Sequence, residues 1–190
     1  GHEVTELRRA ERELEHRANH DSLTGLVNRG RLRMELQAAI DRAAEDGGGL
    51  GLLYIDLDGF KRVNDRGGQA VGDRLLRELA GRMQRAVRQN DLVARVGGDE
   101  FVVLLPDCRD AEAAREVADE LRARITAPCR LPEGLFQLDA SIGVATFPAD
   151  GADAETLLAV ADGVMYAAKH GTRHRIECVI DGLKTGTGAA

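Results

Sequence analysis

Apolar residues recur along the chain at two spacings, and each spacing predicts a different kind of element. Intervals of three and four residues predict α-helices, and short apolar runs bounded by turn residues predict buried β-strands. By these criteria we expect helices over residues 3–20, 21–46, 67–87, 111–126 and 153–169. The expected strands cover residues 50–57, 92–96, 101–105, 136–146 and 175–180.

The order of these elements predicts the fold class. Helix, strand, helix, hairpin, helix, strand, helix and strand imply an α/β (α+β) domain with a split βαβ central sheet, and we expect its helices to pack mainly on one face. This domain is expected at residues 21–180, after an N-terminal helix at 1–20. Residues 181–190 are expected to be a flexible tail.

The N-terminal segment is rich in charge, and its apolar residues follow a heptad pattern. The residues at a and d positions of that pattern are Val4, Leu7, Leu14 and Ala18. Glu11 interrupts the seam. Two interpretations stay open, a short coiled-coil linker between two copies of the chain and a solvated helix that only leads into the domain.

Composition excludes several classes of protein. The 190 residues, 43% of them apolar, can fill one core, while a net charge of −6 argues against a basic face for nucleic acid. No apolar run approaches the roughly 18 residues of a membrane helix, so we expect no membrane segment in this chain and place any anchor of the parent protein outside it. Three widely spaced cysteines, without disulfide or metal-ligand spacing, favour the cytoplasm.

Two acidic segments carry the candidate chemistry. Asp56 and Asp58 end a buried strand, and Asp99 and Glu100 occupy the tip of the expected hairpin. If that tip lies beside the end of the strand, the carboxylates form an oxygen-rich site suited to Mg²⁺ or Mn²⁺. A calcium EF-hand is not supported, because the loop follows a strand and lacks the Gly and bidentate Glu at the required positions. Together the clusters favour metal-assisted phosphoryl transfer.

Neighbouring residues indicate what such a site would bind. Gly97 and Gly98 would let the backbone approach a bulky ligand and adopt the positive φ of a tight turn. Asn64 and Asp73 offer an amide and a carboxylate, which together match the N1–H and N2–H₂ donors and the O6 acceptor of guanine. Adenine cannot make the same set of hydrogen bonds.

Six short motifs occur in one characteristic order and spacing. They are "DSLTGLVNR" (21–29), "DLDGFKRVND" (56–65), "VGD" (71–73), "GGDEF" (97–101), "SIGVA" (141–145) and "ADGVMYAAK" (161–169). Together they resemble the GGDEF-domain family, the diguanylate cyclases. The resemblance implies a fold similar to class III nucleotide cyclases and polymerase palm domains. It also implies condensation of two GTP molecules into cyclic di-GMP across a homodimer, with release of two pyrophosphates.

The same resemblance implies roles for single residues. Asp56, the carbonyl of Leu57, Asp99 and Glu100 would ligate Mg²⁺ (or Mn²⁺), with two ions per active site. Asp99 would also accept the proton of the attacking 3′-hydroxyl, and Lys61 would steady phosphate charge. Asn64 and Asp73 would read guanine, while the triphosphate would be reached by two basic residues near the C-terminus. The full set of positions expected to contact GTP is Phe60, Asn64, Gln69, Asp73, Gly97, Gly98, Lys169 and Arg173.

A further motif is Arg88 and Asp91 in "RQND", with five residues between Asp91 and Gly97. It matches the family's inhibitory RxxD site, at which cyclic di-GMP binds as product and inhibitor. The alternative is a surface ion pair worth about 0–1 kcal/mol. Two departures from the family stand out: Gln69 replaces a customary His, and the glycine after Lys169 comes one residue early.

Three functions therefore remain open. They are an active cyclase, a catalytically silent cyclic di-GMP receptor that uses Arg88 and Asp91, and a structural dimerising module. A silent receptor is expected to have lost acidic residues at the hairpin tip. Because Asp99 and Glu100 are both present, we favour the enzyme and rank the receptor second.

Overall fold

The computed structural model describes residues 1–171, 176–180 and 183–187. Helices in this part of the chain are α1 (His2–Asn19), α2 (Arg29–Asp46), α3 (Phe60–Gly67), α4 (Gln69–Ala86), α5 (Ala111–Thr126) and α6 (Ala154–His170). The strands are β1 (Leu50–Asp58), β2 (Leu92–Arg95), β3 (Glu100–Leu105), β4 (Cys129–Leu131), β5 (Gly134–Phe136), β6 (Asp139–Phe147), β7 (Ile176–Ile180) and β8 (Leu183–Thr187).

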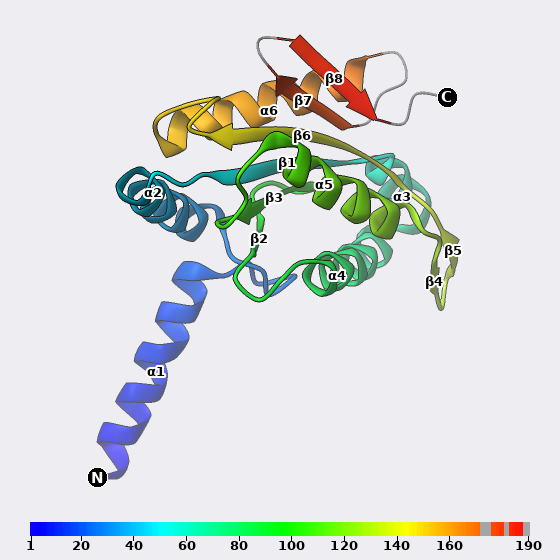
Figure 1. Cartoon of the computed structure of the whole chain (residues 1–190). Coiled ribbons are helices and arrows are strands. Elements are labelled where there is room, and N and C mark those ends of the chain that lie inside the picture. The colour runs from blue at the N-terminus through cyan, green and yellow to red at the C-terminus, as the bar shows by residue number, and fades with distance from the viewer. Residues whose placement is uncertain (172–175, 181–182, 188–190) are drawn as a thin grey trace.

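The main sheet has the strand order β2-β3-β1-β6-β7-β8, and β4 pairs with β5 in a separate hairpin (Figure 1). β1 is antiparallel to both β3 and β6, while β6 and β7 are parallel. Strands β1, β2, β3 and β6, connected through α3, α4 and α5, form a split βαβ arrangement. The predicted fold class is confirmed.

Helices cover both faces of the sheet, so the expectation that they pack mainly on one face was wrong. Leu53 and Ile55 of β1 join a core with α4 and α5, while Leu52 and Tyr54 join a second core with α2 and α6 (Figure 1). Successive strand residues point to opposite faces. The uninterrupted apolar run of β1 is therefore explained by burial on both sides.

Several element boundaries also differ from the prediction. Residues 21–28 form a turn rather than the start of a helix, and α2 begins after Asn28, whose side chain accepts a hydrogen bond from the Arg31 amide. The helix expected over 67–87 is preceded by a separate helix, α3. Gly68, with φ +84°, separates the two. Strand β8 lies within the segment that we expected to be a flexible tail.

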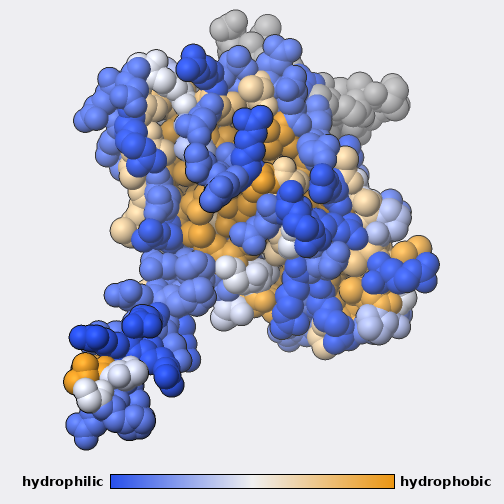
Figure 2. Space-filling view, turned by 60° about the horizontal axis from the view of Figure 1, so that its bottom comes forward, coloured by the Kyte–Doolittle hydropathy of each residue, from blue (hydrophilic) through white to orange (hydrophobic). Residues whose placement is uncertain are grey.

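Helices α1 and α6 differ in how closely they pack against the rest of the chain. α1 extends away from the rest of the chain, and none of its residues is buried (Figure 1). Its surface is mostly hydrophilic with a small hydrophobic area (Figure 2). Toward the other end of the chain, α6 lies tightly against β6 at Gly143, a position without a side chain. A Cβ at Gly143 would lie only 2.2 Å from the carbonyl oxygen of Ala161. This close approach brings the C-terminal part of α6 toward the end of β1.

Candidate active site

The sheet register brings the two acidic segments together. Asp56 on β1 pairs directly with Glu100, the first residue of β3. The Leu57 amide donates a hydrogen bond to the carbonyl oxygen of Asp99 at 3.1 Å, which continues the contact beyond the strand pair. The hairpin tip thus lies beside the end of β1, as the order of elements predicted.

A lysine from α6 lies against these carboxylates. Lys169 forms an ion pair with Oδ2 of Asp56, and its Nζ is 3.9 Å from Oδ1 of Asp58. Burial raises the pKa of Asp56, a hydrogen bond from Lys169 opposes this shift, and the charges of Asp99 and Asp58 add to it. The hydrogen bond to Asp56 raises the pKa of Lys169, which therefore stays charged. Lys169, expected to reach the triphosphate, contacts carboxylates in this structure.

The oxygen atoms at this site fit a hard divalent cation. Oδ1 of Asp56 is buried and accepts no hydrogen bond from the described residues, although a buried carboxylate oxygen needs a donor or a cation. Within the described chain, no group of three or more histidine, cysteine or acidic side chains forms a metal site on its own. Mg²⁺ is ordinarily held by one or two carboxylates together with substrate phosphates, so a protein-only cage is not needed.

The candidate guanine-binding residues lie on α3 and α4. Asn64 and Asp73 are half-buried, and Oδ1 of Asn64 is buried without a hydrogen-bond donor among the described residues. A Cβ at Gly72 would lie 1.8 Å from that oxygen, so the absence of a side chain at this position makes room for Asn64. Phe60 packs in the core at 8% exposure. Lys61 and Gln69 are exposed, and Arg173 lies outside the described residues.

The two glycines of the hairpin differ from the expectation in their backbone conformation. Neither Gly97 nor Gly98 adopts a positive φ, so the prediction of a left-handed turn was wrong. A Cβ at Gly97 would instead lie 3.3 Å from Cβ of Glu100 and 3.5 Å from its carboxylate. Gly97 therefore lets the Glu100 side chain lie close against the hairpin backbone, while the space beside Gly98 is open.

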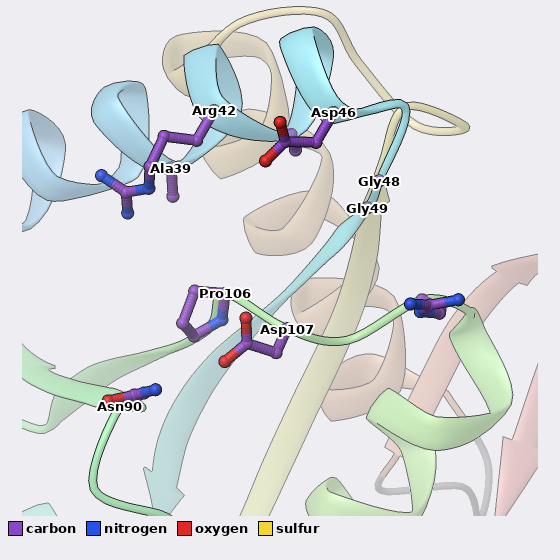
Figure 3. Close-up of a pocket in the computed structure, with 10 residues that line it drawn as sticks. Ala39, Arg42, Asp46, Gly48, Gly49, Asn90, Pro106 and Asp107 are labelled. Atoms are coloured by element: carbon purple, nitrogen blue, oxygen red, sulfur yellow. The ribbon is translucent and has the colours of Figure 1, made fainter.

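Arg88 and Asp91 lie in the turn between α4 and β2. The Arg88 amide donates to Oδ2 of Asp91 at 2.9 Å, and the Asp91 amide donates back to the Arg88 carbonyl at 3.0 Å. A cavity of about 660 Å³ opens beside this turn, with Leu105 and Val117 in its lining. A second cavity of about 630 Å³ shares Asn90, Asp107 and Arg109 with the first and reaches Arg42 of α2 (Figure 3).

Comparison with known protein families finds that the model described as "Diguanylate cyclase, GGDEF domain" matches residues 18–175. The chain belongs to this family. The bifunctional diguanylate cyclase/cyclic di-GMP phosphodiesterase MucR of Pseudomonas aeruginosa is 44% identical over 166 residues, which are 87% of this chain and 24% of MucR. The chain spans between 21% and 37% of the length of the first curated relatives.

Solved structures of GGDEF domains share the fold. The isolated GGDEF domain of PA1120 (TpbB or YfiN) from P. aeruginosa matches with a TM-score of 0.79 and 41% identity, covering 83% of this chain and 93% of that one. The coiled coil and GGDEF domain of DgcB from Caulobacter crescentus, in complex with c-di-GMP, match with a TM-score of 0.84 and 28% identity over 93% of each chain. No helix among the described residues of this GGDEF domain is long and apolar enough to cross a membrane.

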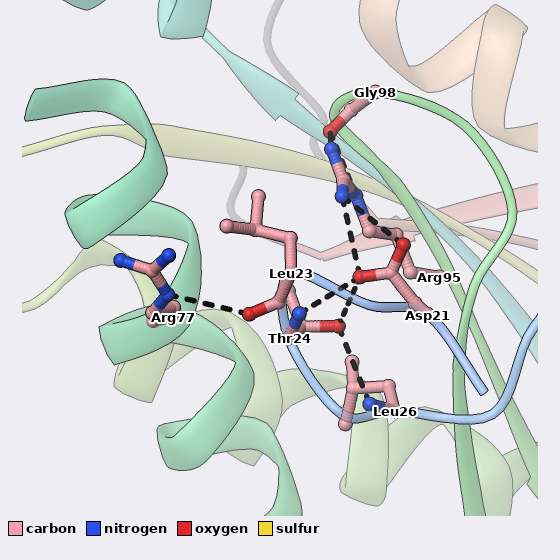
Figure 4. Close-up of polar contacts among 7 residues, drawn as sticks. All are labelled: Asp21, Leu23, Thr24, Leu26, Arg77, Arg95 and Gly98. Carbon is pink, nitrogen blue, oxygen red and sulfur yellow. Dashed lines mark hydrogen bonds and ion pairs between the residues drawn. The ribbon is translucent and has the colours of Figure 1, made fainter. Parts of the chain in front are cut away.

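The GGDEF domain holds its hairpin tip through Arg95, a residue to which the sequence analysis assigned no role. Its guanidinium donates to both carboxylate oxygens of Asp21 at 3.2 Å and to the Gly98 carbonyl at 2.8 Å (Figure 4). Asp21 also accepts hydrogen bonds from the amide and hydroxyl of Thr24. Although burial raises the pKa of Asp21, the bonds from Thr24 and Arg95 outweigh it and lower that pKa. The only feature of the sequence that could have indicated this contact was the motif that contains Asp21.

Proposed function

We propose that this GGDEF domain is a diguanylate cyclase, which condenses two GTP molecules into cyclic di-GMP and releases two pyrophosphates. The observation that carries the proposal is the pairing of Asp56 with Glu100, because it brings acidic residues of two strands to one point. Family membership and relatives named diguanylate cyclases support the same reaction.

The acidic residues have separate tasks in this reaction. Asp56, the carbonyl of Leu57, Asp99 and Glu100 would hold two Mg²⁺ or Mn²⁺ ions per active site. When bound, such ions stabilise negative charge on the attacking and leaving oxygens of a phosphoryl transfer. Asp99, half-buried at the turn, takes the proton from the attacking 3′-hydroxyl. Lys61, exposed in the first turn of α3, attracts the phosphates.

Guanine recognition falls to Asn64 and Asp73. Oδ1 of Asn64 accepts from a guanine N–H, and the Asp73 carboxylate accepts from the remaining donors. Since a buried hydrogen-bonding site rejects a base that leaves its polar groups unpaired, ATP binds poorly. Phe60 and Gln69 complete the nucleotide side of the site, and Lys169 and Arg173 complete the phosphate side.

Catalysis requires two copies of the chain. Each copy has one set of GTP-binding residues, whereas the product joins two nucleotides symmetrically. Two domains therefore face each other across a two-fold axis, and each GTP offers its 3′-hydroxyl to the other's α-phosphate. The DgcB structure includes a coiled coil with its GGDEF domain, which favours the coiled-coil interpretation of α1.

Product inhibition is assigned to Arg88 and Asp91. The cavity beside them has a volume of about 660 Å³, within the range of small-molecule sites, and DgcB has been solved with c-di-GMP. A cyclic di-GMP receptor without catalysis is the second candidate, because this cavity does not depend on the acidic tip.

Mass spectrometry of the products formed from GTP and Mg²⁺ tests the proposal. We expect cyclic di-GMP from the wild-type chain and at least a roughly 100-fold lower rate from Glu100→Gln, since one lost charge-stabilising group typically costs about 10²–10³ in rate. The matched control is Glu112→Gln, the same change at an exposed position of α5. Binding of cyclic di-GMP without any product at high protein concentration would support the receptor instead.

A further inference from the structure

Glu100 has a partly buried contact that the proposed chemistry does not explain. The phenol hydroxyl of Tyr54 donates a hydrogen bond to Oε2 of Glu100 at 3.1 Å. Tyr54 lies on β1 two residues before Asp56, so the two side chains point to the same face of the sheet. Strand β1, which carries Asp56, thus also supplies a hydrogen-bond donor to Glu100.

The surroundings of Tyr54 fix this donor in place. Its side chain is 7% exposed and belongs to the core formed with Leu32 of α2 and Met165 of α6. A phenol has an ordinary pKa of about 10, so the hydroxyl is protonated at neutral pH and acts as a donor to a carboxylate. Because the ring packs against α2 and α6, the core fixes the position of its hydroxyl. A hydroxyl on an exposed side chain would be mobile instead.

Gly97 limits Glu100 from the hairpin side. A Cβ at Gly97 would lie 3.5 Å from Oε2 of Glu100, the same oxygen that accepts the Tyr54 hydrogen bond. The carboxylate is therefore confined between the hairpin backbone and a fixed hydroxyl group. A hydrogen bond to Oε2 directs the carboxylate and favours metal binding through its other oxygen.

We infer that Tyr54 is a positioning residue that orients the Glu100 carboxylate for the divalent cation. The inference rests on the proposed role of Glu100 as a metal ligand of a cyclase. Hydrogen-bonding partners of ligating carboxylates typically contribute about 10- to 100-fold to metal affinity or activity. A phenylalanine at this position keeps the packed ring and removes only the hydroxyl, which separates positioning from packing.

The test measures Mn²⁺ affinity by electron paramagnetic resonance in the presence of 3′-deoxy-GTP, which lacks the attacking hydroxyl. Tyr54→Phe is expected to weaken Mn²⁺ binding by about 10- to 100-fold. Tyr166→Phe is the matched control, because it removes the chain's other phenol hydroxyl from a side chain that is 62% exposed on α6. It should keep the wild-type affinity. Thermal unfolding of each variant checks that the fold is retained.

A second comparison tests whether Tyr54 affects Mn²⁺ affinity through Glu100. In a Glu100→Ala background, Tyr54→Phe should cause no further loss of Mn²⁺ affinity, since the acceptor is already gone. Wild-type Mn²⁺ affinity in Tyr54→Phe, or an equal loss in the Glu100→Ala background, would overturn the inference. Absence of Mn²⁺ binding by the wild-type chain would overturn it together with the metal site. A chain whose Mn²⁺ affinity depends on Tyr54 but which makes no cyclic di-GMP would support the positioning role and refute the cyclase.

Discussion

At the residue scale, buried oxygens without donors mark both ends of the proposed GTP site. Oδ1 of Asp56 and Oδ1 of Asn64 are buried and accept no hydrogen bond from the described residues. Leaving a buried polar atom unsatisfied costs about 1–3 kcal/mol. Such a cost is tolerated where a ligand completes the contact, and under the proposed function the ligands would be a cation at Asp56 and a guanine donor at Asn64.

Gly72→Ala should damage nucleotide binding although it improves helix propensity. The added methyl group would lie 1.8 Å from Oδ1 of Asn64, so the amide must leave its position. We expect GTP affinity to fall roughly 5- to 150-fold, which corresponds to about 1–3 kcal/mol for an unpaired buried group. Titration with a fluorescent GTP analogue measures the change.

Gly81→Ala on the same helix is the control for this variant. Its added Cβ would meet only the end of the flexible Arg85 side chain, at 3.0 Å. Alanine is about 0.8–1.0 kcal/mol more favourable than glycine in a helix interior, so this variant should be slightly more stable and bind GTP normally. Equal GTP affinity in both variants would contradict the role of Asn64.

Arg88→Ala should separate inhibition from catalysis. Arg88 lies in the turn before β2, at the opposite end of this strand from the hairpin tip with Asp99 and Glu100, so the initial rate should stay close to that of the wild type. Loss of a charge-assisted hydrogen bond of about 1.5–3 kcal/mol should weaken cyclic di-GMP binding roughly 10- to 150-fold. Calorimetry measures that affinity, with Arg85→Ala on the exposed part of α4 as control. Unaltered binding in Arg88→Ala would refute the inhibitory site.

At the element scale, the hairpin tip is connected to the segment that follows α1. Asp21 comes two residues after the end of α1, and Arg95 is the penultimate residue before the two glycines of the tip. The Arg95 guanidinium contacts both, with its side chain 16% exposed and that of Asp21 20% exposed. The position of the tip therefore depends on the local structure of the turn after α1.

Asp21→Ala should destabilise the domain in a pH-dependent way. Removing the acceptor leaves Arg95 and Thr24 without their shared partner, at a cost of about 1–3 kcal/mol at pH 7. Because the folded-state pKa of Asp21 is lowered, this stabilisation is present above the ordinary aspartate pKa of about 3.9 and is lost as the pH falls through the lower folded value.

Urea unfolding at neutral and acidic pH measures this difference. The gap in unfolding free energy between wild type and Asp21→Ala should narrow as the pH approaches the folded pKa of Asp21. Asp119→Ala, which removes an exposed carboxylate on α5, should show a small and pH-independent effect. A constant gap for Asp21→Ala at every pH would mean that its ionised carboxylate does not contribute.

Elements were predictable where apolar residues repeat, and less so where they do not. α3 contains only two buried residues, Phe60 and Val63, too few to produce a periodic pattern. The adjacency of the acidic segments followed from the order of strands alone. By contrast, the Arg95–Asp21 pair spans 74 positions and the Tyr54–Glu100 pair spans 46. Such contacts depend on strand register and side-chain rotamers, which no local pattern encodes.

At the scale of the whole molecule, the proposed reaction needs a second copy and α1 offers the means to hold it. The apolar residues of its seam are largely exposed: Val4 at 49%, Leu7 at 61% and Leu14 at 64%. With 18 residues, α1 is short for a stable coiled coil by itself. It would therefore raise the effective concentration of facing domains only modestly.

Deletion of residues 1–19 should lower specific activity at dilute protein while lowering the domain's unfolding midpoint only slightly, because no residue of α1 is buried and Asn28 loses its hydrogen bonds to the carbonyls of Ala18 and Asn19. Specific activity of the intact chain should rise with protein concentration in the micromolar range, since two half-sites must meet. Fusing a parallel leucine zipper in heptad register before Val4 should restore or exceed the original rate, whereas a zipper out of register is the control. The measurement is initial rate against enzyme concentration. Strict proportionality down to nanomolar protein, unaffected by the deletion, would show that α1 is not what holds the dimer together.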